Sequence, residues 1–215
     1  MDLSDNLNRS ASFVGKLFSD AGNLLILIVL GIIPIVNLIV TGYFARIVRE
    51  NPEEPPKLSD YVKLFIDGLL VAIAAIIYMI VPIIILGVGI AFSIGGYAFY
   101  SPMSLLSSLL SSGLVIVGVI LAFIFAIFGV IAIGNMIRTG NFSKIFAFSE
   151  NWQLIQRIGL GNYILWLVVM FVIGLIAATI GSEIHWVVGS ILGALLEVFY
   201  GKSLALMMNE AMGTS

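Results

Sequence analysis

Long runs of apolar residues alternate with short polar segments along this 215-residue chain. Four runs, residues 68–92, 113–137, 161–181 and 186–208, are long enough to cross a bilayer. About 20 helical residues span a hydrocarbon core of about 30 Å. The pattern predicts an all-α, polytopic integral membrane protein with four spanning helices, the first kinked at Pro82.

A fifth apolar run, residues 24–49, is interrupted halfway by Pro34. The ten residues before the proline make about 15 Å of helix, which reaches only the middle of a bilayer. Proline lacks a backbone donor and can end a helix, and Asn37 can cap the returning half. We expect a re-entrant hairpin with its tip at residues 33–37. The alternative is a kinked fifth spanning helix.

Three segments have apolar residues at helical spacing among charged ones, as amphipathic interfacial helices do. They are residues 1–23, 58–67 and 141–159. In the last of them Ile145, Phe148, Trp152 and Ile155 share a face. Residues 50–59 form a polar loop, and residues 103–112 form a short surface helix or extend the next span.

Short motifs recur along the chain. Residues 16–20 (KLFSD) return as 63–67 (KLFID), and residues 42–46 (GYFAR) are echoed at 134–138 (GNMIR). We interpret these as three repeat-like units within one transmembrane domain, each with a surface helix, a helix going in and a helix coming back. The units are residues 1–49, 58–138 and 142–208.

The charges support the hairpin. With a re-entrant first unit, all ten lysines and arginines lie on one side, and the opposite connections, 93–112 and 182–186, contain none. The positive-inside rule makes that side, with both termini, the cytoplasmic side of the cell membrane. If residues 24–49 span instead, Arg9 and Lys16 lie on the other side, a split of eight to two.

Composition narrows the functional classes. Hydrophobic residues make up 60% of the chain and charged residues 10%, against about 25% charged in soluble domains. A net charge of −2 gives no attraction to nucleic acid. Without cysteine and with one histidine, thiolate and multi-histidine metal sites are excluded. No catalytic constellation is visible, so we expect no enzyme and no cofactor.

Three residues are candidates for substrate binding: Pro34, Asn37 and Glu197. The half-helix that starts at the hairpin tip carries partial positive charge, which suits an anion; the alternative is that Asn37 only caps it. Glu197 lies eleven residues into the last run, where a carboxyl group is costly and marks a functional hypothesis. The alternative is that the span ends near Tyr200 and Glu197 lies at the interface.

Other charged residues are expected to form a structural layer of ion pairs or lipid contacts at the cytoplasmic surface. We expect Asp67 to pair with Lys63, and Arg46 to lie in the same layer as Arg138. The full set is Arg46, Arg49, Lys63, Asp67, Arg138 and Arg157. The 22 glycines favour close helix packing and a homo-oligomer.

Several motifs resemble a known family. They are residues 34–37 (PIVN), Gly42-Tyr43 with Arg46 and Arg49, Leu64-Phe65 with 67–69 (DGL), and the 146–163 block with Arg157-Ile158-Gly159. In this order they are similar to the archaeal membrane proteins of domain-of-unknown-function family 4013, over nearly the whole chain. The resemblance implies an archaeal cell membrane and no particular activity.

Two functions fit this architecture. The first is a channel or transporter for a small solute or ion, with an anion as the candidate, and it requires a hydrated polar cavity beside residues 34–37. The second is a non-transporting scaffold that binds membrane lipids or takes part in assembly. It requires a dry helix bundle with an amphipathic cytoplasmic surface.

Overall fold

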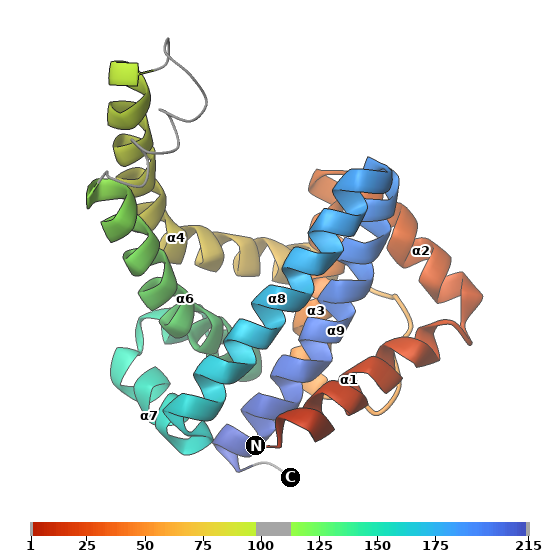
Figure 1. Cartoon of the computed structure of the whole chain (residues 1–215). Helices are drawn as coiled ribbons and strands as arrows, with labels where there is room; N and C mark the ends of the chain where they lie inside the picture. The colour runs from red at the N-terminus through yellow and green to blue at the C-terminus, as the bar shows by residue number, and fades with distance from the viewer. Residues whose placement is uncertain (1, 98–112, 214–215) are drawn as a thin grey trace. The chain divides into compact units, whose positions relative to one another are not determined.

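The computed structural model describes residues 2–97 and 113–213, and these residues form helices and no strand (Figure 1). The chain divides into two compact units. One unit combines residues 1–73 with 131–215, and the other consists of residues 74–130. Helices α4 (Tyr61–Tyr97) and α6 (Gly113–Thr139) each contribute to both units.

The N-terminal part of the first unit is a bent run of short helices. Helix α1 (Leu3–Leu17) meets α2 (Ala21–Ile32) at an angle of 101°. After Pro34 come the short 3-10 helix η1 (Ile35–Asn37) and α3 (Leu38–Glu50). Figure 1 shows α2 leading to the tip and α3 returning from it. The chain therefore reverses at the predicted break, as a hairpin does.

Helix α9 (Trp186–Met212) is the centre of this unit. It packs against α1, α2 and α3, and also against α7 (Phe148–Ile158) and α8 (Leu160–Ile184). A single residue, His185, joins α8 to α9. Near that turn the two helices nearly touch, since a Cβ on Gly181 would lie 2.5 Å from the Cα of Gly189.

The second unit is an antiparallel pair formed by parts of α4 and α6. A Cβ on Gly118 would meet Leu86 at 2.7 Å, and a Cβ on Gly129 would meet Tyr78 at 3.1 Å. The residue numbers of the contacting positions therefore decrease along α4 as they increase along α6, as in an antiparallel pair. The rings of Tyr78 and Phe125 add an edge-to-face contact at 6.5 Å.

Four helices are long and apolar enough to cross a membrane, and a fifth span results if the bent pair α1 and α2 is counted as one. They are α4 (as Tyr61–Ser93), α6, α8 and α9. This confirms the predicted all-α, polytopic membrane class. In α4, α6 and α8 less than a quarter of the apolar window is buried, which leaves wide apolar surfaces for lipid.

Three predicted boundaries were wrong. Residues 58–67 are not a separate surface helix, because α4 runs on from Tyr61 through Gly68. The 141–159 segment is two helices, η2 (Phe142–Phe146) and α7, and the Asn151 side chain joins them by donating to the Lys144 carbonyl at 3.0 Å. The 1–23 segment includes the start of α2. The predicted helix at residues 103–112 lies outside the described residues.

Candidate functional site

Two of the three predicted site residues come together. Glu197 lies on α9, and its carboxyl group lies near the side chains of Thr41 and Asn37. Its Oε2 atom is buried and has no hydrogen-bond partner within the described part of the chain. Asn37 ends η1 and Thr41 lies in the first turn of α3, so the carboxyl group faces the returning half of the hairpin. Pro34 is exposed at the tip.

Close packing brings the hairpin to α9. A Cβ on Gly31 would lie 3.0 Å from the Cβ of Ala194 and 3.9 Å from Asn37 Oδ1. The glycine therefore allows a close approach of α2 to α9 beside the polar group. The neighbours of Glu197 on the hairpin are a carboxamide and a hydroxyl.

The prediction that Asn37 caps the returning half-helix was wrong. The Asn37 side chain makes no capping hydrogen bond to α3. The backbone of η1 provides acceptors instead, and the Leu38 N–H bonds to the carbonyl of Ile35. Because the 3-10 turn continues directly into the α-helix, the Asn37 side chain is available to Glu197.

A second polar cluster surrounds Lys202, which also lies on α9 and is only 2% exposed. Its Nζ donates to Asn51 Oδ1 at 2.9 Å and to the Pro52 carbonyl at 2.7 Å. It also lies 3.9 Å from the Glu53 carboxylate and 5.2 Å from the Phe13 ring centroid. Lys202 therefore fastens the loop after α3 to the central helix.

The charged residues predicted to form a layer have partners that differ from those expected. Asp67 Oδ2 accepts from Arg49 Nη1 at 2.8 Å, whereas the sequence suggested Lys63, which is exposed. Arg46 pairs with Glu50 at 3.2 Å. The remaining arginines bind backbone carbonyls: Arg138 binds those of Arg49 and Ala205, and Arg157 binds that of Ala211. The layer is thus mainly structural.

Two further hydrogen-bond networks join the helices. Trp166 Nε1 donates to Ser203 Oγ at 2.8 Å, and Ser203 Oγ donates to Asn6 Oδ1 at 2.5 Å. On α6, Asn135 Nδ2 donates to Glu150 at 3.0 Å and to Asn151 at 2.9 Å. Asn135 and Ser203 are polar residues within apolar helices, which is a signal that predicts interhelical hydrogen bonds.

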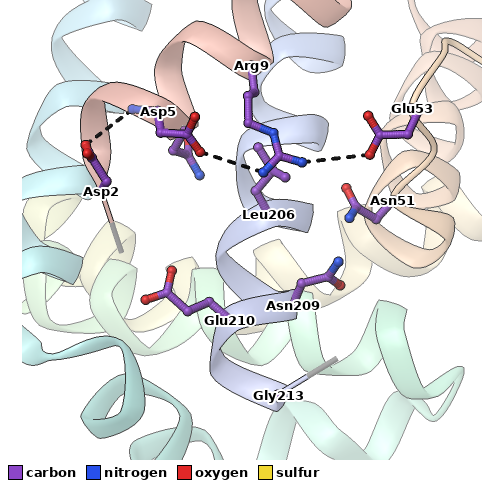
Figure 2. A pocket seen from close by; sticks show the side chains of 10 residues that line it. Asp2, Asp5, Arg9, Asn51, Glu53, Leu206, Asn209, Glu210 and Gly213 are labelled. Atoms are coloured by element: carbon purple, nitrogen blue, oxygen red, sulfur yellow. Dashed lines mark hydrogen bonds and ion pairs between the residues drawn. The ribbon is translucent and has the colours of Figure 1, made fainter. Parts of the chain in front are cut away.

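A groove of about 580 Å³ opens beside the polar end of α9. Figure 2 shows Arg9 at its centre, between Asp5 at 3.7 Å and Glu53 at 3.8 Å. An adjoining hollow of about 250 Å³ shares Arg9 and Glu53 and adds Lys16 and Lys202. Among the described residues no group of His, Cys, Asp or Glu side chains could hold a metal ion. The larger groove is lined by Asp2, Asp5, Asn6, Arg9, Asn51, Glu53, Leu206, Asn209, Glu210 and Gly213.

The helices and the buried polar cluster define a multi-pass α-helical membrane protein. The model of a family of proteins of unknown function, DUF4013, matches residues 25–186. The chain therefore belongs to the DUF4013 family. The match includes Asn37 and Thr41 and ends at Trp186, before Glu197. No curated protein and no solved structure was found to match the chain.

Proposed function

We propose that this membrane protein passes a small ion across the bilayer, as a channel or transporter. The observation that supports the proposal is the buried carboxyl oxygen Oε2 of Glu197, on a helix long enough to span a membrane. Ionisable groups inside a bilayer are costly and mark ion pathways in membrane proteins.

The depth of Glu197 fits such a pathway. Glu197 lies eleven residues after Trp186, which begins α9, and this corresponds to about 16 Å of helix. If the hydrocarbon core begins near Trp186, this distance corresponds to the middle of a core of about 30 Å. Many transporters bind their ions at this depth, between a spanning helix and the ends of broken helices. Here the broken element is α2, η1 and α3, so the proposal includes re-entry of residues 24–49.

The proposal also includes a homo-oligomer and an orientation in the membrane. The apolar faces of α4, α6 and α8 that are not buried within the chain are available to lipid and to further copies. The charged layer of Arg49, Asp67 and Arg138 lies at the opposite end of α3 from the hairpin tip. By the positive-inside rule, we infer that this layer and both termini face the cytoplasm.

A scaffold that binds lipid is the second candidate. The surface elements expose aromatic side chains: Phe146, Phe148 and Trp152 are each more than a third exposed. Lys144 lies in the same segment and pairs with Glu150 at 2.6 Å. Exposed aromatic rings beside basic residues suit the headgroup region of a membrane.

The experiment is ion flux in proteoliposomes. Purified protein would be reconstituted, a membrane potential imposed with an ionophore, and the uptake of monovalent cations and anions followed with ion-sensitive dyes. We expect flux with the natural protein and its loss in Glu197→Gln. The matched control is Glu183→Gln, because Glu183 is an exposed carboxyl group near the C-terminal end of α8. Folded protein that passes no ion would favour the scaffold.

A further inference from the structure

We propose that the site between α9 and the hairpin takes a monovalent cation, H⁺ or Na⁺, rather than the anion that the sequence suggested. The inference rests on the ion-passage function proposed above. The ligand groups are the carboxyl group of Glu197, the side-chain amide of Asn37 and the hydroxyl of Thr41.

The sign of the charge at the site comes from Glu197. The tip brings together the C-terminal end of α2, which is partially negative, and the N-terminal end of η1 and α3, which is partially positive. These two partial charges oppose each other. The carboxylate therefore decides the balance, and it repels an anion at close range.

The basic residues of α3 and α9 have other partners. Lys202, the next basic residue along α9, is bonded to Asn51 and Pro52. On α3, Arg46 is paired with Glu50 and Arg49 with Asp67. On α2 there is no charged residue. The titratable group that faces the hairpin tip from α9 is thus Glu197, with neutral partners.

The charge count selects a monovalent ion. One carboxylate balances one positive charge, so the loaded site is neutral. A divalent ion would leave one uncompensated positive charge in a buried place, which is expensive. The described residues also contain no group of three acidic or histidine side chains around a common point, as a dedicated divalent site would need.

The atoms at the site suit a small, hard ion. Glu197 Oε2 is buried without a hydrogen-bond partner within the described part of the chain, so it has a lone pair to offer. Asn37 and Thr41 lie near the same carboxyl group, and their side chains also carry oxygen atoms, an amide carbonyl and a hydroxyl. Carboxylate, carbonyl and hydroxyl oxygens bind hard cations, and a carboxylate also binds a proton directly.

The test is chemical labelling of the full-length protein in detergent. Dicyclohexylcarbodiimide reacts with protonated carboxyl groups in apolar surroundings, and mass spectrometry of peptides locates the adduct. We expect an adduct on Glu197 that forms more slowly as the pH is raised. If the ion is Na⁺, NaCl also slows the reaction and choline chloride does not. If the ion is H⁺, the two salts act alike and only the pH matters.

Variants test whether the adduct is on Glu197 and whether Thr41 contributes to ion binding. Glu197→Gln should lose the adduct, while Glu183→Gln should keep it. If Na⁺ is the ion, Thr41→Val should raise the Na⁺ concentration for half-protection at least about tenfold, the size expected for one hydrogen bond to a charged group. The proposal is overturned if Glu197 is not labelled, or if its labelling responds to the anion supplied and not to pH or Na⁺.

The two proposals fail separately. Protection of Glu197 by Na⁺ or by high pH, with no ion flux in proteoliposomes, would overturn ion passage and keep the cation site. Undiminished flux in Glu197→Gln would overturn the cation site and keep ion passage.

Discussion

Lys202 of α9 donates a hydrogen bond to the side chain of Asn51, at 2.9 Å. Asn51 ends α3 in the left-handed region, with φ at 43°, so the bond fixes the residue where the chain leaves the hairpin. The same ammonium group holds Pro52 and lies over Phe13 of α1. One buried side chain thus ties α9 to both the surface helix and the loop.

The first prediction follows from this contact. Lys202→Met should lower the free energy of unfolding by about 2–4 kcal/mol, because two acceptors lose their donor. The measurement is an unfolding titration in mixed micelles. Lys63→Met is the matched control, since Lys63 is exposed and should change stability by less than about 0.5 kcal/mol. Equal effects in the two variants would contradict the anchoring role of Lys202.

The second prediction concerns the crossing of α3 and α4. A Cβ on Gly42 would lie 1.7 Å from the Leu64 carbonyl oxygen, and one on Gly68 would lie 1.8 Å from that of Leu38. Gly42→Ala should therefore destabilise the protein by at least about 3 kcal/mol, since backbone must move. Gly15→Ala in α1 has open space and should stabilise it by about 0.5–1 kcal/mol. The same titration measures both variants. If Gly42→Ala leaves the free energy of unfolding unchanged, this crossing is wrong.

The third prediction is a dependence on pH. Hydrogen bonds from Lys144 and then Asn135 lower the pKa of Glu150 below its ordinary value of 4.5. A carboxyl group with a lowered folded-state pKa stabilises the fold above pH 4.5. This contribution to stability is lost as the pH falls through the folded-state pKa. Because Glu150 is partly exposed, the effect should be small.

Hydrogen exchange of α7, corrected for intrinsic rates, measures this effect. The natural protein should protect α7 better than Glu150→Gln above pH 4.5, and the difference should shrink below it. A difference that grows on acidification would contradict the assignment.

The fourth prediction concerns topology. The chain has no cysteine, so single substitutions can be labelled with an impermeant thiol reagent in oriented membranes. Ser4→Cys should label from the same side as Ser143→Cys, and Ser182→Cys from the opposite side. Labelling of Ser4→Cys together with Ser182→Cys would mean that residues 24–49 cross the membrane, and would remove the basis for a site at the hairpin tip.

Much of the fold could be predicted from local patterns. The four spanning helices follow from apolar length, and Pro34 marks the break because its ring prevents a continuous helix. Helix boundaries were harder. Gly68 was taken as the start of a span, yet it lies within α4, where the absence of a Cβ allows close contact with Leu38. Glycine in a helix can mark a crossing as well as an end.

The site could be predicted only in part. Asn37 and Glu197 were each noticed as polar groups in apolar surroundings, but nothing local indicates that they meet, because the contact depends on how α9 packs. The same reason explains why Asp67 was assigned to Lys63, a neighbour one turn away, while its partner is Arg49 on another helix. The three repeat-like units stay a prediction.

The central place of α9 has a consequence for biosynthesis. All of its partners, α1, α2, α3, α7 and α8, precede it in the chain. During translation none of these contacts can form until residues 186–212 have left the ribosome. The hairpin and the surface helices must therefore stay at the membrane without α9 until it has been synthesised. The polar site near Asn37 is complete only after Glu197 has packed against it.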